Sequence, residues 1–415
     1  MAKGFYTLLI AQFLSAIADN ALLFAAIALL SKLNAPHWHE PLLREFFVIS
    51  YIVLAPFVGP FADAMPKGKV MFISNGIKFF GCLMALMGVP PLYAYAIVGI
   101  GAAAYSPAKY GILTELLPSH QLIKANAWME GTTVTAIILG PILGADIAAV
   151  NTYEKVNIIF GMHFDPAMAP YYGIAIITLL YMVAAWFNAY IPKLPIDHKI
   201  PKKNIVYLVK DFWHAFTTLW RDPQGQVSLA VTTLFWGAGA TLQFVVLRWA
   251  SVKLGMDEQA ATKLIAILAV GIAVGSIGAS MFVKLENATR VLPAGILMGI
   301  LVISMIFVKS NETAAVVLFC IGVLAGYFLV PLNSLLQHRG HHLLGAGHSI
   351  AVQNFNENIG ILLMLGAYTL MLHQGLAINA IIIIFGSFVG ITMAIIYKLY
   401  QQSTRLANKA NSNAA

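Results

Sequence analysis

Long apolar runs are the feature of this sequence that most limits its fold. A helix needs about 20 mostly apolar residues to cross a bilayer. Inside hydrocarbon every backbone hydrogen bond must be made within the protein, and helices meet that condition. We therefore predict an all-α integral membrane protein with twelve transmembrane helices, at 5–31, 43–62, 70–88, 92–114, 122–148, 171–191, 226–250, 260–283, 291–308, 313–336, 344–372 and 376–400.

The composition agrees with a membrane protein. Of the 415 residues 60% are hydrophobic and 10% are charged, whereas soluble domains have about 25% charged residues. The net charge of +8 does not indicate a nucleic-acid partner, because the basic residues lie in loops between apolar runs. Most of them fall on one side when both termini are cytoplasmic, as the positive-inside rule requires. We predict a multi-pass protein with cytoplasmic N and C termini.

One long polar stretch divides the runs into six and six. The predicted domains are an N-terminal half at 1–191, a cytoplasmic linker at 192–225, a C-terminal half at 226–400 and a cytoplasmic tail at 401–415. Within the linker, Ile205 to Trp220 has apolar residues at helical spacing, which favours an amphipathic helix on the inner surface over a plain linker. Val150 to Ala169 is the one long loop on the outer side.

The two halves repeat a pattern. Pro107 precedes Glu130 by 23 residues, and Pro331 precedes Asn354 by the same 23. Parallel repeats of six spans joined by a cytoplasmic linker are typical of the major facilitator fold. We predict that fold.

Charged groups inside the runs point to a site. Asp19, followed by Asn20, lies near the middle of the first span, and Lys78 and Lys109 lie in the third and fourth. An ionisable residue at that depth is by default a functional candidate. The alternative is an Asp that only pairs with a neighbouring helix. Lys78 or Lys109 could neutralise Asp19 or Glu130, reach a lipid phosphate, or extend to the inner interface.

Polar stripes mark two further helices. Asn126 and Glu130 are four residues apart and share one face of the fifth span. The eleventh span carries a stripe of four residues: Gln353, Asn354, Glu357 and Asn358. These stripes line either a cavity or a seam between helices, and both alternatives stay open here.

The loop after the second span resembles the inner gate of major facilitator transporters. It reads GPFADAMPKGK and contains Asp63, Lys67 and Lys69, with which we group Lys78 of the following span as gating residues. The cluster from His338 to His348 fits no metal motif and is predicted to be a basic cytoplasmic loop.

Catalytic patterns are absent from the sequence. It contains no G-x-S-x-G elbow, no P-loop and no H-E-x-x-H. The H-x-x-x-x-D pattern of glycerolipid acyltransferases is also missing. We expect no catalytic residue, no metal, no cofactor and no enzymatic activity.

Several long strings resemble one family. GAAAYSPAKYGILTELLP, KANAWMEG, PLNSLLQHRG and AVQNFNEN closely resemble the bacterial lysophospholipid transporter (LplT) family of the major facilitator superfamily, and the resemblance covers nearly the whole chain. It implies movement of lysophospholipids, chiefly lysophosphatidylethanolamine, from the outer to the inner leaflet of the bacterial inner membrane. It also implies a separate cytoplasmic acyltransferase/acyl-ACP synthetase that replaces the missing acyl chain.

The resemblance also implies which residues meet the cargo. Gln243 stands where close relatives carry an Arg in the seventh span, and Arg248 follows five residues later. We expect alternating access with lipid reaching the site from the side, Asp19 and Glu130 holding the ethanolamine ammonium and Lys109 attracting the phosphate. The expected substrate-binding residues are Asp19, Asn20, Lys109, Asn126, Glu130, Gln243, Gln353, Asn354, Glu357 and Asn358.

Other functions remain as alternatives. An antiporter of a soluble or amphipathic small molecule would use the same fold, with Asp19 or Glu357 as the proton-titrating carboxylate. A membrane-embedded acyltransferase lacks its catalytic pattern, and a structural scaffold leaves the intramembrane charges unexplained.

Overall fold

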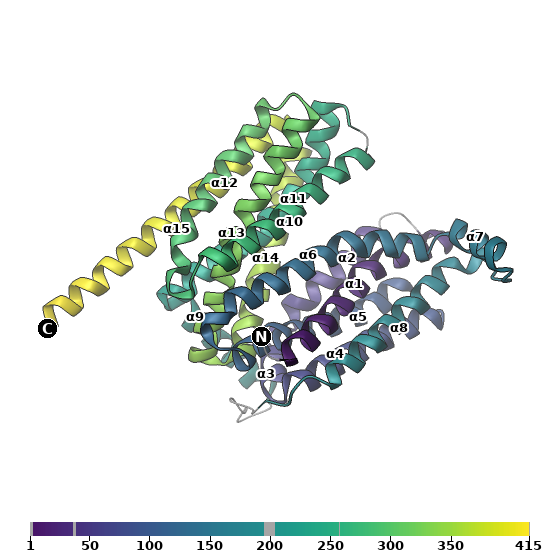
Figure 1. Cartoon of the computed structure of the whole chain (residues 1–415), viewed down its shortest axis with the longest axis horizontal. Coiled ribbons are helices and arrows are strands. Elements are labelled where there is room, and N and C mark those ends of the chain that lie inside the picture. Colours follow the sequence, from purple (N-terminus) through teal and green to yellow (C-terminus); the bar gives the residue numbers. More distant parts are fainter. Residues whose placement is uncertain (1–2, 36–38, 195–203, 257, 415) are drawn as a thin grey trace. The chain divides into compact units, whose positions relative to one another are not determined.

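The computed structural model describes residues 3–35, 39–194, 204–256 and 258–414. Across these ranges the chain is helical, without a β-strand, as predicted. Figure 1 shows its α-helices. They are α1 (Lys3–Lys32), α2 (His39–Val53), α3 (Ala55–Asp63), α4 (Lys67–Leu86), α5 (Pro91–Leu116), α6 (Leu122–Ile147), α7 (Val150–Phe160), α8 (Ala169–Ala189), α9 (Ile205–Arg221), α10 (Pro223–Leu254), α11 (Glu258–Phe282), α12 (Leu292–Ser304), α13 (Asn311–Leu344), α14 (Ala346–His373) and α15 (Ile378–Ala414).

Each predicted span falls on a helix. The run 43–62 is split into α2 and α3, which are bent by 64°, and Pro56 occupies the first turn of α3, where proline is tolerated. By length and hydropathy, nine helices of the described ranges can cross a membrane, or eleven if each bent pair is one span. The remaining predicted run, 92–114, lies in α5, which is not among these helices. Its apolar residues are interrupted by tyrosines, glycines and Lys109.

Two helices, α9 and α7, lie outside the spans that the sequence predicts. α9 covers the predicted 205–220 helix and buries Phe212, Ala215 and Leu219 on one face. Residues 195–203 of the predicted linker lie outside the described residues, and the predicted domain boundaries remain a prediction. The outer stretch predicted to be a loop, 150–169, instead begins with a helix, α7.

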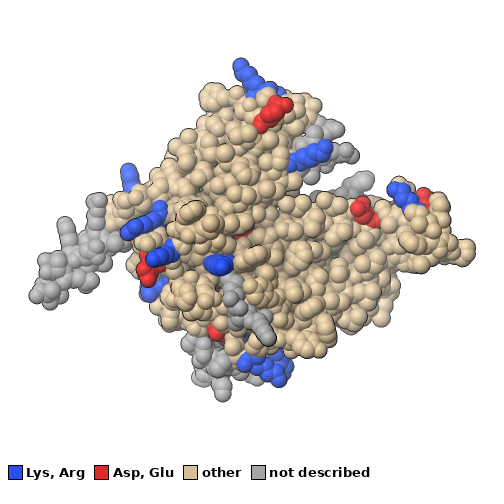
Figure 2. All heavy atoms as spheres, in the orientation of Figure 1, with Lys and Arg blue, Asp and Glu red and all other residues tan. Residues whose placement is uncertain are grey.

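The chain forms two compact units. Unit 1 consists of residues 1–117, 135–213 and 344–354, and unit 2 of 118–134, 214–343 and 355–415. On the face drawn in Figure 2, uncharged atoms cover most of the surface, as expected for helices that contact lipid.

Within unit 1, α1 packs against α8, and α4 packs against both α5 and α8. The apolar core there includes Leu22, Leu29, Tyr95 and Tyr181. Within unit 2, the core surrounds Trp249 and Phe328, both almost fully buried.

Glycines let two helices of unit 2 approach closely. On α11, Gly271 faces the backbone of Phe319 and Gly322, and Gly275 faces the backbone carbonyl of Val323. On α13, Gly326 faces the carbonyl of Ile272. Small residues four apart are the usual means by which membrane helices pack without side chains between them.

The start of α10 is fixed by Asp222. Its side chain accepts a hydrogen bond from Gly225 N at 2.9 Å and pairs with Arg339 of α13. Partial burial, the largest single influence, acts to raise the pKa of Asp222, but the hydrogen bonds from Arg339 and Gly225 hold it below its ordinary value.

We predict that Gly275→Ala destabilises the protein and that Gly278→Ala on the same helix does not. A methyl group at 275 would overlap the Val323 carbonyl, whereas at 278 the nearest atom, on Tyr327, is 3.9 Å away. Overpacking of this kind costs about 1–3 kcal/mol. Thermal unfolding of both variants in detergent measures the difference, and equal midpoints would contradict the close approach of α11 and α13.

Candidate functional site

A fully buried lysine is the centre of the candidate site. Lys78 of α4 has 0% of its surface exposed. Its Nζ lies 2.8 Å from each carboxylate oxygen of Asp19 on α1 and 3.0 Å from Ser15 Oγ. The ring centroids of Tyr105 and Tyr181 lie 4.8 and 5.4 Å from the same Nζ. The ammonium therefore has the partners that a charge in a low-dielectric interior requires.

Asp19 has a second partner and some exposure. Tyr181 of α8 donates its hydroxyl hydrogen to Asp19 Oδ1 at 2.7 Å. The side chain of Asp19 remains 21% exposed. Ser15, one turn before Asp19, donates to Asn75 Oδ1 at 2.8 Å. Five residues on α1, α4 and α8 thus form one hydrogen-bonded network within unit 1: Ser15, Asp19, Asn75, Lys78 and Tyr181.

The geometry shows which basic residue pairs with Asp19. Asp19 does pair with a neighbouring helix, and its partner is Lys78 rather than Lys109. We grouped Lys78 with the gating residues, but its ionic partner is Asp19. Lys78 balances the charge of Asp19.

Local packing makes room for Lys78. Gly101 of α5 faces Lys78 Cγ and the Ser74 carbonyl, and a Cβ at 101 would lie 2.7 Å from each. The glycine lets α5 close over the lysine and bury it.

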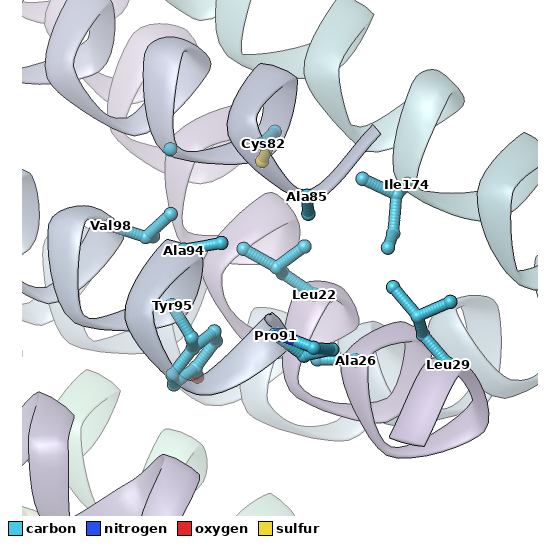
Figure 3. Close-up of a pocket in the computed structure, with 11 residues that line it drawn as sticks. Leu22, Ala26, Leu29, Cys82, Ala85, Pro91, Ala94, Tyr95, Val98 and Ile174 are labelled. Atoms are coloured by element: carbon cyan, nitrogen blue, oxygen red, sulfur yellow. The ribbon is translucent and has the colours of Figure 1, made fainter. Parts of the chain in front are cut away.

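A small apolar pocket lies near this network within unit 1. Figure 3 shows it between side chains from α1, α4, α5 and α8. Leu22 lies three residues after Asp19, and Cys82 lies four residues after Lys78, so that the pocket is about one helical turn from the ion pair. The other lining residues are Ala26, Leu29, Gly81, Ala85, Pro91, Ala94, Tyr95, Val98 and Ile174.

A second polar cluster surrounds Asp63 at the end of α3. Its carboxylate accepts hydrogen bonds from the backbone N–H groups of Gly347 at 2.8 Å and His348 at 3.1 Å, in the first turn of α14. A carboxylate at a helix N-terminus satisfies free N–H groups and the helix dipole together. Lys67 lies 2.5 Å from Asp63 Oδ1 and 3.4 Å from Glu115.

Two members of this cluster were missed by sequence reasoning. The His348 ring lies between two carboxylates, with Nδ1 2.6 Å from Asp63 and Nε2 3.0 Å from Asp211 of α9. The sequence analysis placed His348 in a basic loop at 338–348, but these histidines lie in the last turns of α13 and the first turn of α14. It did not single out Asp211 on the amphipathic helix. Lys69, predicted with the gate, has an exposed side chain.

Within unit 2, Asn126 of α6 pairs with Gln337 of α13. Their side-chain amides exchange two hydrogen bonds, of 2.9 and 2.8 Å, and both residues are buried. Gln337 was not predicted. Asn126 therefore lies in a seam between helices, and Glu130, one turn further along α6, is also buried.

The stripe on α14 is divided. Asn354 donates to Ser106 Oγ of α5 at 2.9 Å, so this residue also lies in a seam. Gln353 and Glu357 are buried, and Asn358 is partly buried.

The remaining predicted residues differ in their surroundings. Asn20 donates to the Ala16 carbonyl of its own helix at 2.8 Å. Lys109 Nζ lies 4.2 Å from the ring centroid of the adjacent Tyr110. On α10, Gln243 is partly buried and Arg248 is exposed. Among the described residues no group of three His, Cys, Asp or Glu side chains is arranged to hold a metal.

Comparison with known proteins identifies the family. Residues 8–364 match the model of the Major Facilitator Superfamily. The lysophospholipid transporter LplT of Yersinia enterocolitica is 42% identical over 92% of this chain and 90% of its own length. LplT of Klebsiella pneumoniae is 43% identical over 95% of this chain and 96% of its own.

Solved structures agree with the fold. A bacterial homologue of the iron transporter ferroportin, in its outward-facing state, matches with a TM-score of 0.72 at 14% identity, covering 97% of this chain and 100% of that one. The E. coli fucose:proton symporter matches with a TM-score of 0.74 at 14% identity, covering 95% and 98%. Likeness at this identity concerns the fold alone. With the family match and these relatives together, the chain belongs to the major facilitator superfamily and, within it, to the lysophospholipid transporter LplT family.

Proposed function

We propose that this protein moves lysophospholipids, chiefly lysophosphatidylethanolamine, from the outer to the inner leaflet of the bacterial inner membrane. The observation that carries the proposal is the extent of the match to relatives named lysophospholipid transporter. They are 42% to 44% identical over 89% to 95% of this chain. A separate cytoplasmic acyltransferase/acyl-ACP synthetase then restores the second acyl chain, and both termini of the transporter are cytoplasmic.

The Asp19–Lys78 pair suits a zwitterionic head group. An unpaired charge is costly at membrane depth. An ethanolamine phosphate carries one ammonium and one phosphate, so it can interact with a neutral ion pair without leaving net charge behind. Asp19, which keeps 21% of its side chain exposed beside a fully buried Lys78, is the member of the pair that reaches the ammonium.

The Asp63 cluster supplies a gate for alternating access. Its contacts join the end of α3 to the first turn of α14 and break when these segments separate. A contact that is made in one state and lost in another biases the equilibrium between them. Asp63 and Lys67 therefore hold the cytoplasmic side closed while lipid reaches the site from the side.

The function is tested in cells that lack their lysophospholipid transporter but retain the acyltransferase. Labelled lysophosphatidylethanolamine is added outside, with and without this chain. We expect labelled diacyl phosphatidylethanolamine only in cells that make the chain. Uptake of a soluble compound without any lipid product would instead support the antiporter alternative.

A double variant separates a structural from a transport role of the ion pair. Asp19→Asn leaves a buried lysine without its counter-charge, which costs about 3–5 kcal/mol when the pair is buried, and we expect less folded protein and less transport. Asp19→Asn combined with Lys78→Met removes both charges. We expect this double variant to recover thermal stability but to transport at least about tenfold more slowly than the parent, a loss of ~1.4 kcal/mol.

Stability and initial transport rate are measured on the same purified samples, reconstituted in vesicles. Tyr181→Phe serves as the matched control, because it removes one hydrogen bond to Asp19 and no charge. If the double variant regains both stability and transport, the pair is structural only, although the cargo assignment from whole cells still stands.

The gate is tested through the accessibility of a buried position on α14. Ala351, 1% exposed, packs beside Val58 and Ala103. We expect a Cys at 351, in a Cys320→Ala background, to react with a maleimide several times faster when Asp63→Asn weakens the contact with α14. Lys69→Gln is the control, since Lys69 is exposed on the same short segment. Equal labelling rates in all three proteins would show that Asp63 does not hold the gate.

A further inference from the structure

A group of exposed apolar side chains ends α7. We define the apolar tip as Ile158, Ile159, Phe160, Met162 and Phe164, which are 83%, 70%, 68%, 48% and 38% exposed. They are close together along the chain, at the end of α7 and in the turn that follows. The exposed His163 lies between the last two of them. Exposed apolar side chains gathered in this way indicate a membrane or a binding partner.

The tip is held in a defined shape. Asn157 donates to the Phe164 carbonyl at 2.7 Å and accepts from the Phe164 N–H at 2.9 Å, which closes the turn. Gly161 ends α7 in the left-handed conformation, with φ of 65°. The ring of Phe164 packs against Tyr153 and Tyr172, with centroids 5.7 and 5.3 Å away. The exposure of Ile158 to Phe160 is therefore built into the fold of this segment.

The tip follows directly on lipid-facing surface. α6 and α7 are bent by 67° at a short break. The last turns of α6 expose Ile142 and Leu143, and α8, which follows the tip, exposes Ile176 and Leu179. Within unit 1, α7 lies at the end of α6 and α8 that is away from α3 (Figure 1). Both spans that adjoin α7 thus expose apolar side chains, while the exposed Asp146, Glu154 and Lys155 lie between Leu143 and the tip along the chain.

The residues around α7 are those of a membrane–water interface. Lys32, at the end of α1, has its Nζ 5.1 Å from the ring centroid of Tyr171 and contacts the Ala167 carbonyl. The rings of Tyr172, Tyr153 and Phe164 form one cluster, in which the centroids of Tyr172 and Tyr153 are 5.0 Å apart. Tyrosine and lysine are typical of the level at which spans leave the hydrocarbon.

We propose that the apolar tip inserts into the acyl-chain region of the leaflet opposite the Asp63 cluster, which the predicted topology makes the outer leaflet. α7 then lies along the interface, with Ile158, Ile159 and Phe160 among lipid chains. Glu154 and Lys155, exposed on the preceding turn, remain at the head groups. An interfacial helix with apolar and charged parts binds the bilayer in this way. The proposal does not depend on which cargo the protein carries.

Depth measurements with spin labels test the proposal. In the full-length Cys320→Ala protein, where Cys82 is buried, single cysteines replace Ile158, Phe160, Lys155 and Leu179 in turn. The labelled proteins are reconstituted in bilayers of phosphatidylethanolamine and phosphatidylglycerol. Collision with oxygen, which concentrates in lipid, is compared with collision with a nickel chelate, which stays in water.

We expect the labels at 158 and 160 to favour oxygen, as the label at Leu179 on a span does, and the label at 155 to favour the nickel chelate. If the labels at 158 and 160 behave like the one at 155, the tip is in water and serves a soluble partner. If they are protected from both reagents, the tip is covered by protein. Either result overturns the proposal.

A second measurement tests whether the apolar side chains cause the insertion. A label at Met162→Cys is followed with and without the pair Ile158→Asp and Phe160→Asp. We expect the pair to move the label at 162 from the oxygen-accessible to the nickel-accessible range, while Lys155→Asp leaves it unchanged. An oxygen-accessible label in all three proteins would show that the tip does not hold α7 at the membrane.

Discussion

An ammonium group with no exposed surface sets the conditions for unit 1. Lys78 can be charged at that depth only because two carboxylate oxygens, a hydroxyl and two aromatic faces surround its Nζ. That requirement determines what the neighbouring helices carry: an acid on α1, a tyrosine on α8 and a glycine on α5 that allows close approach. The small pocket of Figure 3 lies about one turn away, where the same helices present mostly apolar side chains.

The helices could be predicted from the sequence because their signals are local. An apolar run of about 20 residues identifies a span wherever its partners lie. Each such run is helical in the structure, although the run 43–62 is divided into α2 and α3. The depth of Asp19 and Lys78 along their spans also followed from counting residues. α7 was missed because its eleven residues, VNTYEKVNIIF, mix polar and apolar positions without a strong period.

The partners of the polar residues could not be predicted, because their contacts join distant parts of the sequence. Gln337 lies 211 positions from Asn126, Ser106 lies 248 from Asn354, and His348 lies 285 from Asp63. Each of these residues, seen alone, is an ordinary polar residue in or near a span. The resemblance to the gate loop indicated Asp63 and Lys67 but carried no information on what Asp63 would meet.

The internal repeat explains part of the long-range pairing. Ser106 precedes Pro107 on α5 and bonds to Asn354 of α14 within unit 1. The corresponding residue before Pro331 on α13 is Val330, which packs with Ala127 of α6 within unit 2. The two units therefore place equivalent helix faces together, but one contact is polar and the other apolar. The repeat therefore conserves which helix faces pack together but not which side chains meet there.

The Asp63 cluster contains more acidic than lysine side chains. Three carboxylates, Asp63, Glu115 and Asp211, lie around Lys67 and His348. The lysine supplies one positive charge, so the N–H groups at the start of α14 are needed to balance Asp63. His348 extends the cluster to α9, a helix outside the spans, through its bond to Asp211. If α9 is displaced, His348 loses its contact with Asp211 and keeps only its contact with Asp63. α9 and the Asp63 cluster are thus parts of one hydrogen-bonded network within unit 1.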